Sequence, residues 1–177
     1  GSTQKISTTA AAIDTMGYDA LSSKIFNCSG IYKNAEGDDI KCHKSSGHGD
    51  EDISEAFANS CNSYFAQLVA DPSLPLDSLK KSYEKMGYAL NGEKGTKFSI
   101  DGILSFKAST TLTDSNNFNT QWGAMGQGET LVSPCQSMVW QSAIANKTGI
   151  TTNPYFITRA TDVFGEESYK ASTSYSS

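Results

Sequence analysis

Residues 2–16 read STQKISTTAAAIDTM, and Gly17 follows them. Apolar side chains recur in this stretch at spacings of three and four residues, which predicts a helix with one apolar face. Three consecutive alanines favour the same conformation, because Ala has the highest helix propensity. Gly17 is a typical residue just beyond a helix C-terminus. The chain is therefore expected to open with a helix that ends at residue 16.

Ser2 and Lys5 bring a hydroxyl and an amine to one face of this helix, three positions apart. A serine hydroxyl is a poor nucleophile until a neighbour removes its proton, and a lysine does so when burial lowers its pKa. The helix N-terminus also favours negative charge that develops nearby. Because short motifs arise by chance, Ser-x-x-Lys alone more often marks an ordinary exposed helix start.

Composition bounds the class of protein. The 177 residues suffice for one domain with a core, and 37% hydrophobic and 19% charged residues are typical of a globular chain. A net charge of −5 argues against nucleic acid as the main partner, since phosphate binding needs clustered Lys and Arg. The longest apolar run, 10–13, is far below the ~20 residues that span a bilayer. Membrane contact is expected only through a segment absent here, and no cofactor is expected.

Capping signals and apolar periodicity predict further helices. Asp52 and Glu55 form a capping box, and Ser133 followed by Pro is a strong helix start. Asp-Pro at 71–72 and glycines at 87 and 149 mark helix ends. The expected helices run over 53–60, 62–70, 76–86 and from Ser133 to Gly149.

Residues 25–43 are expected to form a β-hairpin, because apolar segments flank the polar loop 34–38. Cys28 and Cys42 then lie on facing strands, where a disulfide would stabilise the fold by about 3 kcal/mol in the chain-entropy model.

A zinc site of Cys28, Cys42, His43 and His48 is the alternative. Its spacing fits no CxxC arrangement, so the disulfide is preferred and no metal is expected. Cys135 is read as a buried small hydrophobe.

Residues 88–125 carry the weakest signals. Segments 98–100 and 103–106 are either short strands or apolar anchors of a long loop, and 109–120 is expected to be irregular. Residues 153–157 are expected to be extended, and 166–177 to form a polar tail. The expected domains are thus a helical unit, 1–165, and the tail.

A second motif, Asn59-Ser60-Cys61-Asn62, lies between two of the expected helices. A locally extended turn would point Ser60 and Asn62 the same way, because they are two positions apart. Ser-x-x-Lys followed by Ser-x-Asn is the motif order of serine acyl-transferases of the penicillin-binding and β-lactamase superfamily.

The chain resembles class B penicillin-binding proteins in several segments that occur in the family's order. The nucleophile-helix segment 1–12 and the second-motif segments 48–49, 55–62 and 65–68 are similar to that family, as are 126–129, 132–138 and 143–146. Together these segments extend across most of residues 1–160. The resemblance implies a mainly α fragment of an α+β parent fold, namely the helical lobe of the transpeptidase fold with a β-hairpin insertion.

The resemblance also implies the site and its chemistry. Ser2 is the acylated nucleophile, Lys5 its base, Ser60 a proton relay and Asn62 a substrate anchor. The implied activity is that of a serine D,D-transpeptidase that crosslinks peptidoglycan stem peptides and is acylated by β-lactams. The implied place is the outer face of the bacterial cytoplasmic membrane, with wall-synthesis proteins as partners. That location favours the disulfide between Cys28 and Cys42, and Cys61 is a small residue that the motif tolerates.

The family's third motif, Lys-Thr-Gly on a strand, is not expected at Lys147-Thr148-Gly149, which directly follows a helix and reads as its C-terminal end. The chain is expected to stop short of that strand. Without the strand's oxyanion donors, this fragment is expected to be inactive or nearly so. Two alternatives stay open: a non-catalytic β-lactam sensor or degenerate scaffold of the family, and an unrelated helical binding domain.

Overall fold

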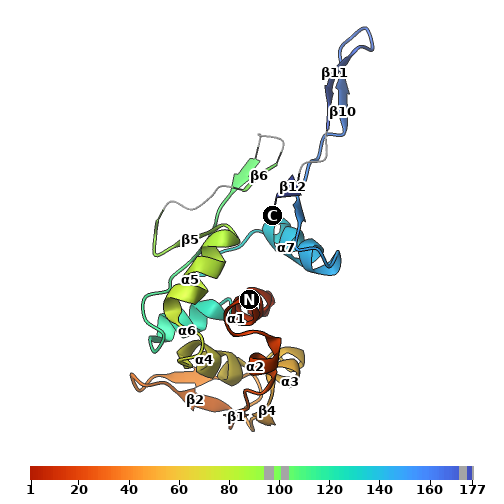
Figure 1. Ribbon diagram of the computed structural model, residues 1–177. Helices are drawn as coiled ribbons and strands as arrows, with labels where there is room; N and C mark the ends of the chain where they lie inside the picture. Colours follow the sequence, from red (N-terminus) through yellow and green to blue (C-terminus); the bar gives the residue numbers. More distant parts are fainter. Residues whose placement is uncertain (94–97, 101–103, 172–174, 177) are drawn as a thin grey trace.

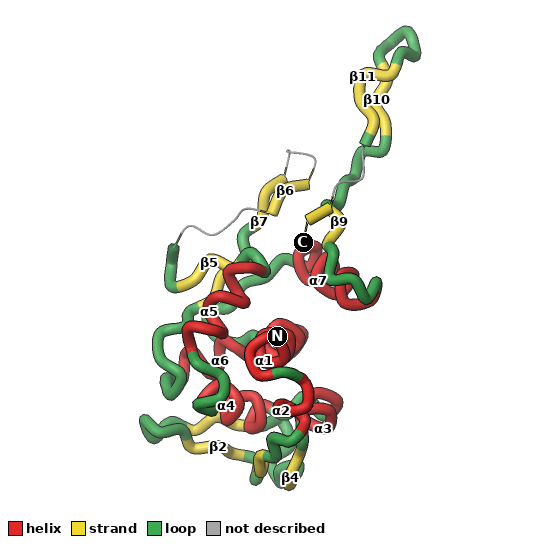
Figure 2. The backbone as a smooth tube through the Cα atoms, viewed as in Figure 1, coloured by secondary structure: helices red, strands yellow, loops and turns green. Residues whose placement is uncertain are grey.

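A computed structural model of the protein describes residues 1–93, 98–100, 104–171 and 175–176. Figure 1 shows helices at the centre, short strands at one end and a hairpin that projects from the other. Figure 2 shows that helix is the dominant regular structure, and strands pair only two at a time within the described residues. The predicted class, a mainly α lobe with a β-hairpin, is confirmed.

The chain starts with a 3-10 turn, Ser2–Gln4, that leads directly into α1, Lys5–Met16. Helix α1 ends where predicted, because Gly17 takes a positive φ of 80° that a side chain would disfavour. A short helix that the sequence did not indicate, α2 (Tyr18–Ser22), follows immediately.

The other predicted helices are present with nearly the expected limits. Asp52 and Glu55 form the capping box, and Ser133 caps the last helix with Pro134 at its first position. The helices are α3 (Ile53–Ala58), α4 (Asn62–Ala70), α5 (Leu76–Lys85) and α7 (Pro134–Ala145).

The predicted hairpin is correct only in its inner part. Strands β2 (Ile31–Lys33) and β3 (Asp39–Lys41) pair antiparallel around the polar loop. The outer strand β1 (Phe26–Cys28) instead pairs with β4 (Gly49–Glu51), which comes after the hairpin. Local turn signals define a hairpin, whereas pairing with a later strand depends on tertiary packing.

Two glycines let the loops beside these strands approach each other. An added Cβ at Gly30 would lie 2.1 Å from the Ser45 carbonyl oxygen, and one at Gly47 would lie 2.0 Å from the Cys28 carbonyl oxygen. Both glycines have positive φ. The segment after β1 and the segment before β4 are therefore in direct backbone contact.

We expect Gly47→Ala to destabilise the protein more than Gly37→Ala. Both glycines have positive φ, 77° and 93°, so each alanine carries backbone strain of about 1–2 kcal/mol. Only Gly47 meets a backbone atom, since nothing lies within 4 Å of a Cβ at Gly37. Thermal unfolding of the whole protein that contains this chain measures the difference. Equal midpoints for the two variants would contradict the close approach.

The weakly predicted region contains more order than expected. Strands β5 (Tyr88–Leu90) and β8 (Ala108–Thr110) pair in parallel, and β6 (Phe98–Ile100) pairs with β7 (Leu104–Phe106). Short strands are therefore the correct alternative for these segments, although Ile103 lies outside the described residues. Helix α6 (Phe118–Ala124) occupies part of the stretch that was expected to be irregular.

The C-terminal part consists of small antiparallel pairs. Strand β9 (Thr151–Thr152) pairs with β12 (Tyr175–Ser176), and β10 (Arg159–Thr161) with β11 (Glu167–Lys170). The chain from 153 to 158 forms no regular element, and the expected polar tail contains β11. Figure 1 shows the β10–β11 hairpin extending away from the helices. The division into domain and tail stays a prediction.

Helix α4 forms the centre of the core. Tyr64, Phe65 and Leu68 are fully buried, and α4 contacts β1, β3 and α6. Helix α1 packs against α5, where Thr8 Oγ1 and Tyr83 Oη lie 2.7 Å apart in a buried hydrogen bond. Thr8 Oγ1 also donates to the Ala124 carbonyl of α6, and α6 packs on α4, so α6 connects the first turns of α1 to α4. In the described part of the chain, no helix combines the length and apolar character needed to cross a bilayer.

Candidate active site

The Lys5 amine joins the two sequence motifs. Its Nζ lies 3.0 Å from Ser2 Oγ in the same helical turn, 3.0 Å from Ser60 Oγ and 2.8 Å from Asn62 Oδ1. It also donates to the Ser60 carbonyl oxygen at 2.9 Å. Residues nearly sixty positions apart thus converge on one nitrogen.

The turn that carries Ser60 and Asn62 is left-handed, not extended as predicted. Ser60 has φ of 52°, and Cys61 is the extended residue that caps α4. The Cys61 N–H donates to the Ala56 carbonyl at 2.8 Å, and Asn62 Nδ2 donates to the Lys41 carbonyl at 3.0 Å. These bonds hold a conformation that is unfavourable for a residue with a Cβ. Both side chains still face Lys5.

Burial changes the acid–base chemistry of Lys5. The residue is 2% exposed, and burial lowers the pKa of its amine to about 8. The neighbouring Cys42 and Cys61 act in the opposite direction with a smaller effect on this pKa. The Phe65 ring, whose centroid lies 5.6 Å from Nζ, is part of the apolar wall. A usable fraction of neutral amine therefore exists near neutral pH.

The start of α1 is held by contacts with distant segments. Tyr88 Oη donates to Gln4 Oε1, and both side chains are buried. An added Cβ at Gly126 would lie 2.0 Å from the Gly1 carbonyl oxygen, so the chain after α6 approaches the N-terminus closely. Ser2 is thereby positioned from two sides. A cleft of about 740 Å³ borders its neighbours Gly1 and Thr3 and extends along α7.

Lys147, Thr148 and Gly149 lie at the C-terminal end of α7, as predicted. The Gly149 N–H donates to the Ala143 carbonyl at 3.2 Å, and Lys147 and Gly149 have positive φ. This segment is a helix cap and not a strand.

The disulfide expected between Cys28 and Cys42 is not formed, because all four cysteines are free thiols. Cys28 ends β1 and Cys42 follows β3, and these two strands pair with different partners. The cysteines are therefore not opposite each other across one ladder. His48 Nδ1 lies 3.6 Å from each sulfur.

The sequence did not indicate two neighbours of the site. Phe65 appeared only as an apolar residue of α4, although its ring lies beside the amine. Cys61 appeared as a tolerated small residue, although its sulfur lies 3.9 Å from Cys42 Sγ. A cysteine inside the second motif, with two more cysteines and two histidines upstream, was the available signal.

The fold is shared with solved penicillin-binding proteins. The ceftriaxone acyl-enzyme complex of penicillin-binding protein A from M. tuberculosis matches with a TM-score of 0.81 at 19% identity, covering 99% of this chain and 37% of that one. A D,D-transpeptidase domain of a peptidoglycan glycosyltransferase from Eggerthella lenta matches with a TM-score of 0.70 at 22% identity, covering 97% of this chain and 42% of that one.

A third match is the complex of penicillin-binding protein PBP2 with MreC from Helicobacter pylori, with a TM-score of 0.69 at 19% identity. It covers 88% of this chain and 28% of that one, so the chain spans less than half the length of each of these three structures. Comparison with curated proteins by sequence gives no match.

The family described as "Penicillin binding protein transpeptidase domain" matches the sequence over residues 1–176. This match covers nearly the whole chain, and the shared fold agrees with it. The chain belongs to the penicillin-binding protein transpeptidase domain family.

Proposed function

We propose that the protein containing this chain is a serine D,D-transpeptidase that crosslinks peptidoglycan stem peptides and is acylated by β-lactams. The observation that carries the proposal is the position of Lys5 Nζ, 3.0 Å from both Ser2 Oγ and Ser60 Oγ. One amine in contact with two hydroxyls can take a proton from the first and return it through the second. This arrangement supports acyl transfer and not simple binding.

The roles follow from the chemistry of each group. Ser2 Oγ attacks the carbonyl carbon of the terminal D-Ala-D-Ala peptide or of the β-lactam amide, and neutral Lys5 accepts the hydroxyl proton. The C–N bond then breaks, and the proton passes through Ser60 Oγ to the leaving nitrogen. Asn62 anchors the substrate amide. An acceptor amine finally attacks the acyl-serine, which releases Ser2 and forms the crosslink.

The rest of the whole protein is expected to supply the strand with the third motif. Large apolar side chains are exposed on α7 and beyond it, such as Met138, Ile144 and Phe156 at 53%, 57% and 69%. Such exposure is typical of a surface that another part covers. We therefore expect residues 1–177 alone to be inactive or nearly so, since each lost oxyanion donor costs about 2.7–4 kcal/mol of transition-state stabilisation.

The expected location is the outer face of the bacterial cytoplasmic membrane. The PBP2–MreC complex from Helicobacter pylori supports wall-synthesis proteins as partners, and acyl-enzyme complexes of penicillin-binding protein A support β-lactams as ligands.

Turnover by the whole protein tests the proposal. We expect it to bind fluorescent penicillin covalently and to crosslink a peptide ending in D-Ala-D-Ala, and Ser2→Ala to lose both activities. Labelling without crosslinking would instead indicate a sensor. No labelling of the folded protein would indicate a scaffold.

The acylation rate is expected to rise with pH up to about pH 8. Only neutral Lys5 accepts a proton, and its pKa is lowered to about 8, so the neutral fraction falls about tenfold per pH unit below that value and levels off above it. Stopped-flow acylation between pH 6 and 9, with a β-lactam that does not titrate in this range, measures the profile. A rate that stays flat or falls between pH 6 and 8 would contradict the base role.

A further inference from the structure

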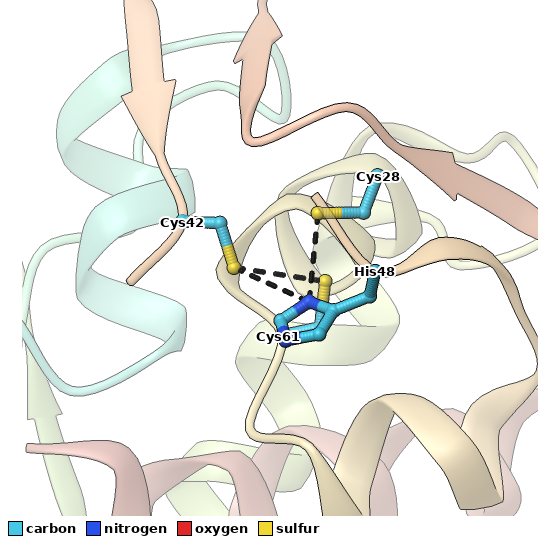
Figure 3. Close-up of side chains that lie close together, drawn as sticks. All are labelled: Cys28, Cys42, His48 and Cys61. Atoms are coloured by element: carbon cyan, nitrogen blue, oxygen red, sulfur yellow. Dashed lines mark hydrogen bonds between the residues drawn. The ribbon is translucent and has the colours of Figure 1, made fainter. Parts of the chain in front are cut away.

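Four side chains from three segments meet beside the candidate active site. Cys28 ends β1, Cys42 follows β3, His48 precedes β4 and Cys61 caps α4. Figure 3 shows their sulfur atoms and the imidazole pointing toward one another, and the four ligand atoms all lie within 4.8 Å of one another.

The separations fit tetrahedral metal coordination. With zinc–sulfur bonds of about 2.3 Å and zinc–nitrogen bonds of about 2.0–2.1 Å, a tetrahedron places two sulfurs about 3.8 Å apart and a sulfur and a nitrogen about 3.6 Å apart. Cys42 Sγ lies 3.9 Å from Cys61 Sγ, and His48 Nδ1 lies 3.6 Å from Cys28 Sγ and from Cys42 Sγ.

The surroundings are also suited to a cation. The three cysteines are 2%, 7% and 0% exposed, and the His48 side chain is 6% exposed. Glu51 Oε2 is buried 3.7 Å from His48 Nδ1 and accepts no hydrogen bond from the described residues. A bound dication would place a positive charge near this carboxylate. Apolar packing alone would leave the buried negative charge unpaired.

We propose that Cys28, Cys42, His48 and Cys61 bind one zinc ion in a closed, structural Cys3His site. Three thiolates and an imidazole are the donor set that zinc prefers, and four protein ligands leave no open position for catalysis. His43, which the sequence grouped with this cluster, is exposed and is not one of the four, and Cys61 takes its place.

The backbone of the loops that carry the four proposed ligands brings these side chains together. The close approaches of Gly30 to Ser45 and of Gly47 to Cys28 press the segment of Cys28 against the segment that runs from Cys42 to His48. The loop from Cys42 to His48 contains no helix or strand, and Cys42 is its only residue in the apolar core. A metal that joins three segments explains how they stay in place.

The site has a consequence for the second motif. Cys61 lies between Ser60 and Asn62, and Asn62 Nδ2 bonds the carbonyl of Lys41, the residue before Cys42. Coordination of Cys42 and Cys61 by one ion fixes both sides of this bond and holds Ser60 at its unfavourable φ of 52°. The four ligands are thus positioning residues for the acylation that we propose above, and this second step alone rests on the proposed function.

Metal content of the whole protein tests the site independently of activity. We expect one zinc per chain by elemental analysis. Cobalt substitution should give the visible bands of tetrahedral Co²⁺ with thiolate-to-cobalt charge transfer in the near ultraviolet. Cys28→Ser and His48→Ala should lose the metal, whereas the matched variants Cys135→Ser and His43→Ala should retain it.

Wild-type protein provides the test that does not depend on the folding of variants. Removal of the metal by a chelator should lower the thermal midpoint and the acylation rate, and added zinc should restore both. If the protein binds the metal but acylates at the same rate after its removal, the positioning role is wrong and the zinc site itself stands. The site itself would be overturned if the purified protein contains no metal and gives no tetrahedral cobalt spectrum. A disulfide within the cluster, in protein purified without oxidant, would overturn it as well.

Discussion

Lys5→Ala is expected to slow acylation of the whole protein by a β-lactam by about 10²–10⁴-fold, the usual contribution of a general base. Lys5 Nζ contacts Ser2 Oγ directly at 3.0 Å, and no other lysine of the described residues has a hydrogen bond to Ser2. The variant keeps the hydroxyl but not the proton acceptor. Stopped-flow acylation measures the loss.

Two further variants separate the base role from a charge effect. Lys85→Ala removes the same charge from an exposed side chain of α5, so it should acylate like the wild type. Lys5→Arg keeps the charge but stays protonated at all accessible pH values, so it should remain slow. Rapid acylation of Lys5→Arg would show that Lys5 acts as a cation and not as a base.

Phe65→Ala is expected to destabilise the protein by about 3–5 kcal/mol, since it truncates a fully buried aromatic side chain. It should also alter the chemistry, because the ring lies 5.6 Å from Lys5 Nζ and excludes water from the amine. With water admitted, the pKa of Lys5 rises toward its ordinary value. The midpoint of the acylation–pH profile should then move to higher pH.

Phe65→Leu and Phe57→Ala are the controls. The first keeps an apolar side chain beside Lys5, and the second removes a ring that is 43% exposed on α3. Both should leave the pH midpoint near 8. A folded Phe65→Ala variant with an unchanged midpoint would contradict the link between burial of Lys5 and its pKa.

The sequence predicted the elements whose signals are local. Helix α3 follows from the capping box of Asp52 and Glu55, and α7 follows from Ser133 and Pro134, because caps are satisfied within one turn. Helix α6 was missed because it has only seven residues, follows a stretch rich in Asn, Thr and Ser, and buries two polar side chains, Thr120 and Gln121, beside its apolar ones. In so short a helix the apolar spacing of Phe118 and Trp122 is a weak signal.

The prediction that Lys5 lies near Ser60 and Asn62 came from the order of the two motifs and not from local physical signals. The turn that presents them was predicted as extended, but φ of Ser60 is 52°, held by bonds to Ala56 and Lys41. The bond to Ala56 closes the C-terminal turn of α3, where glycine is the usual signal, and the bond to Lys41 is a tertiary contact, so the residue types leave no mark of this turn. The placement of Cys28 and Cys42 on facing strands was wrong for the same reason, since β1 pairs with a strand beyond the hairpin.

The position of the covalent adduct tests the proposed acylation site most directly. The whole protein is incubated with benzylpenicillin, digested, and sequenced by mass spectrometry. We expect one penicilloyl adduct on Ser2, which is lost in Ser2→Ala but present in Cys135→Ser. An adduct on another residue, or none on the folded protein, would contradict the assignment of Ser2 and Lys5 as the acylation site.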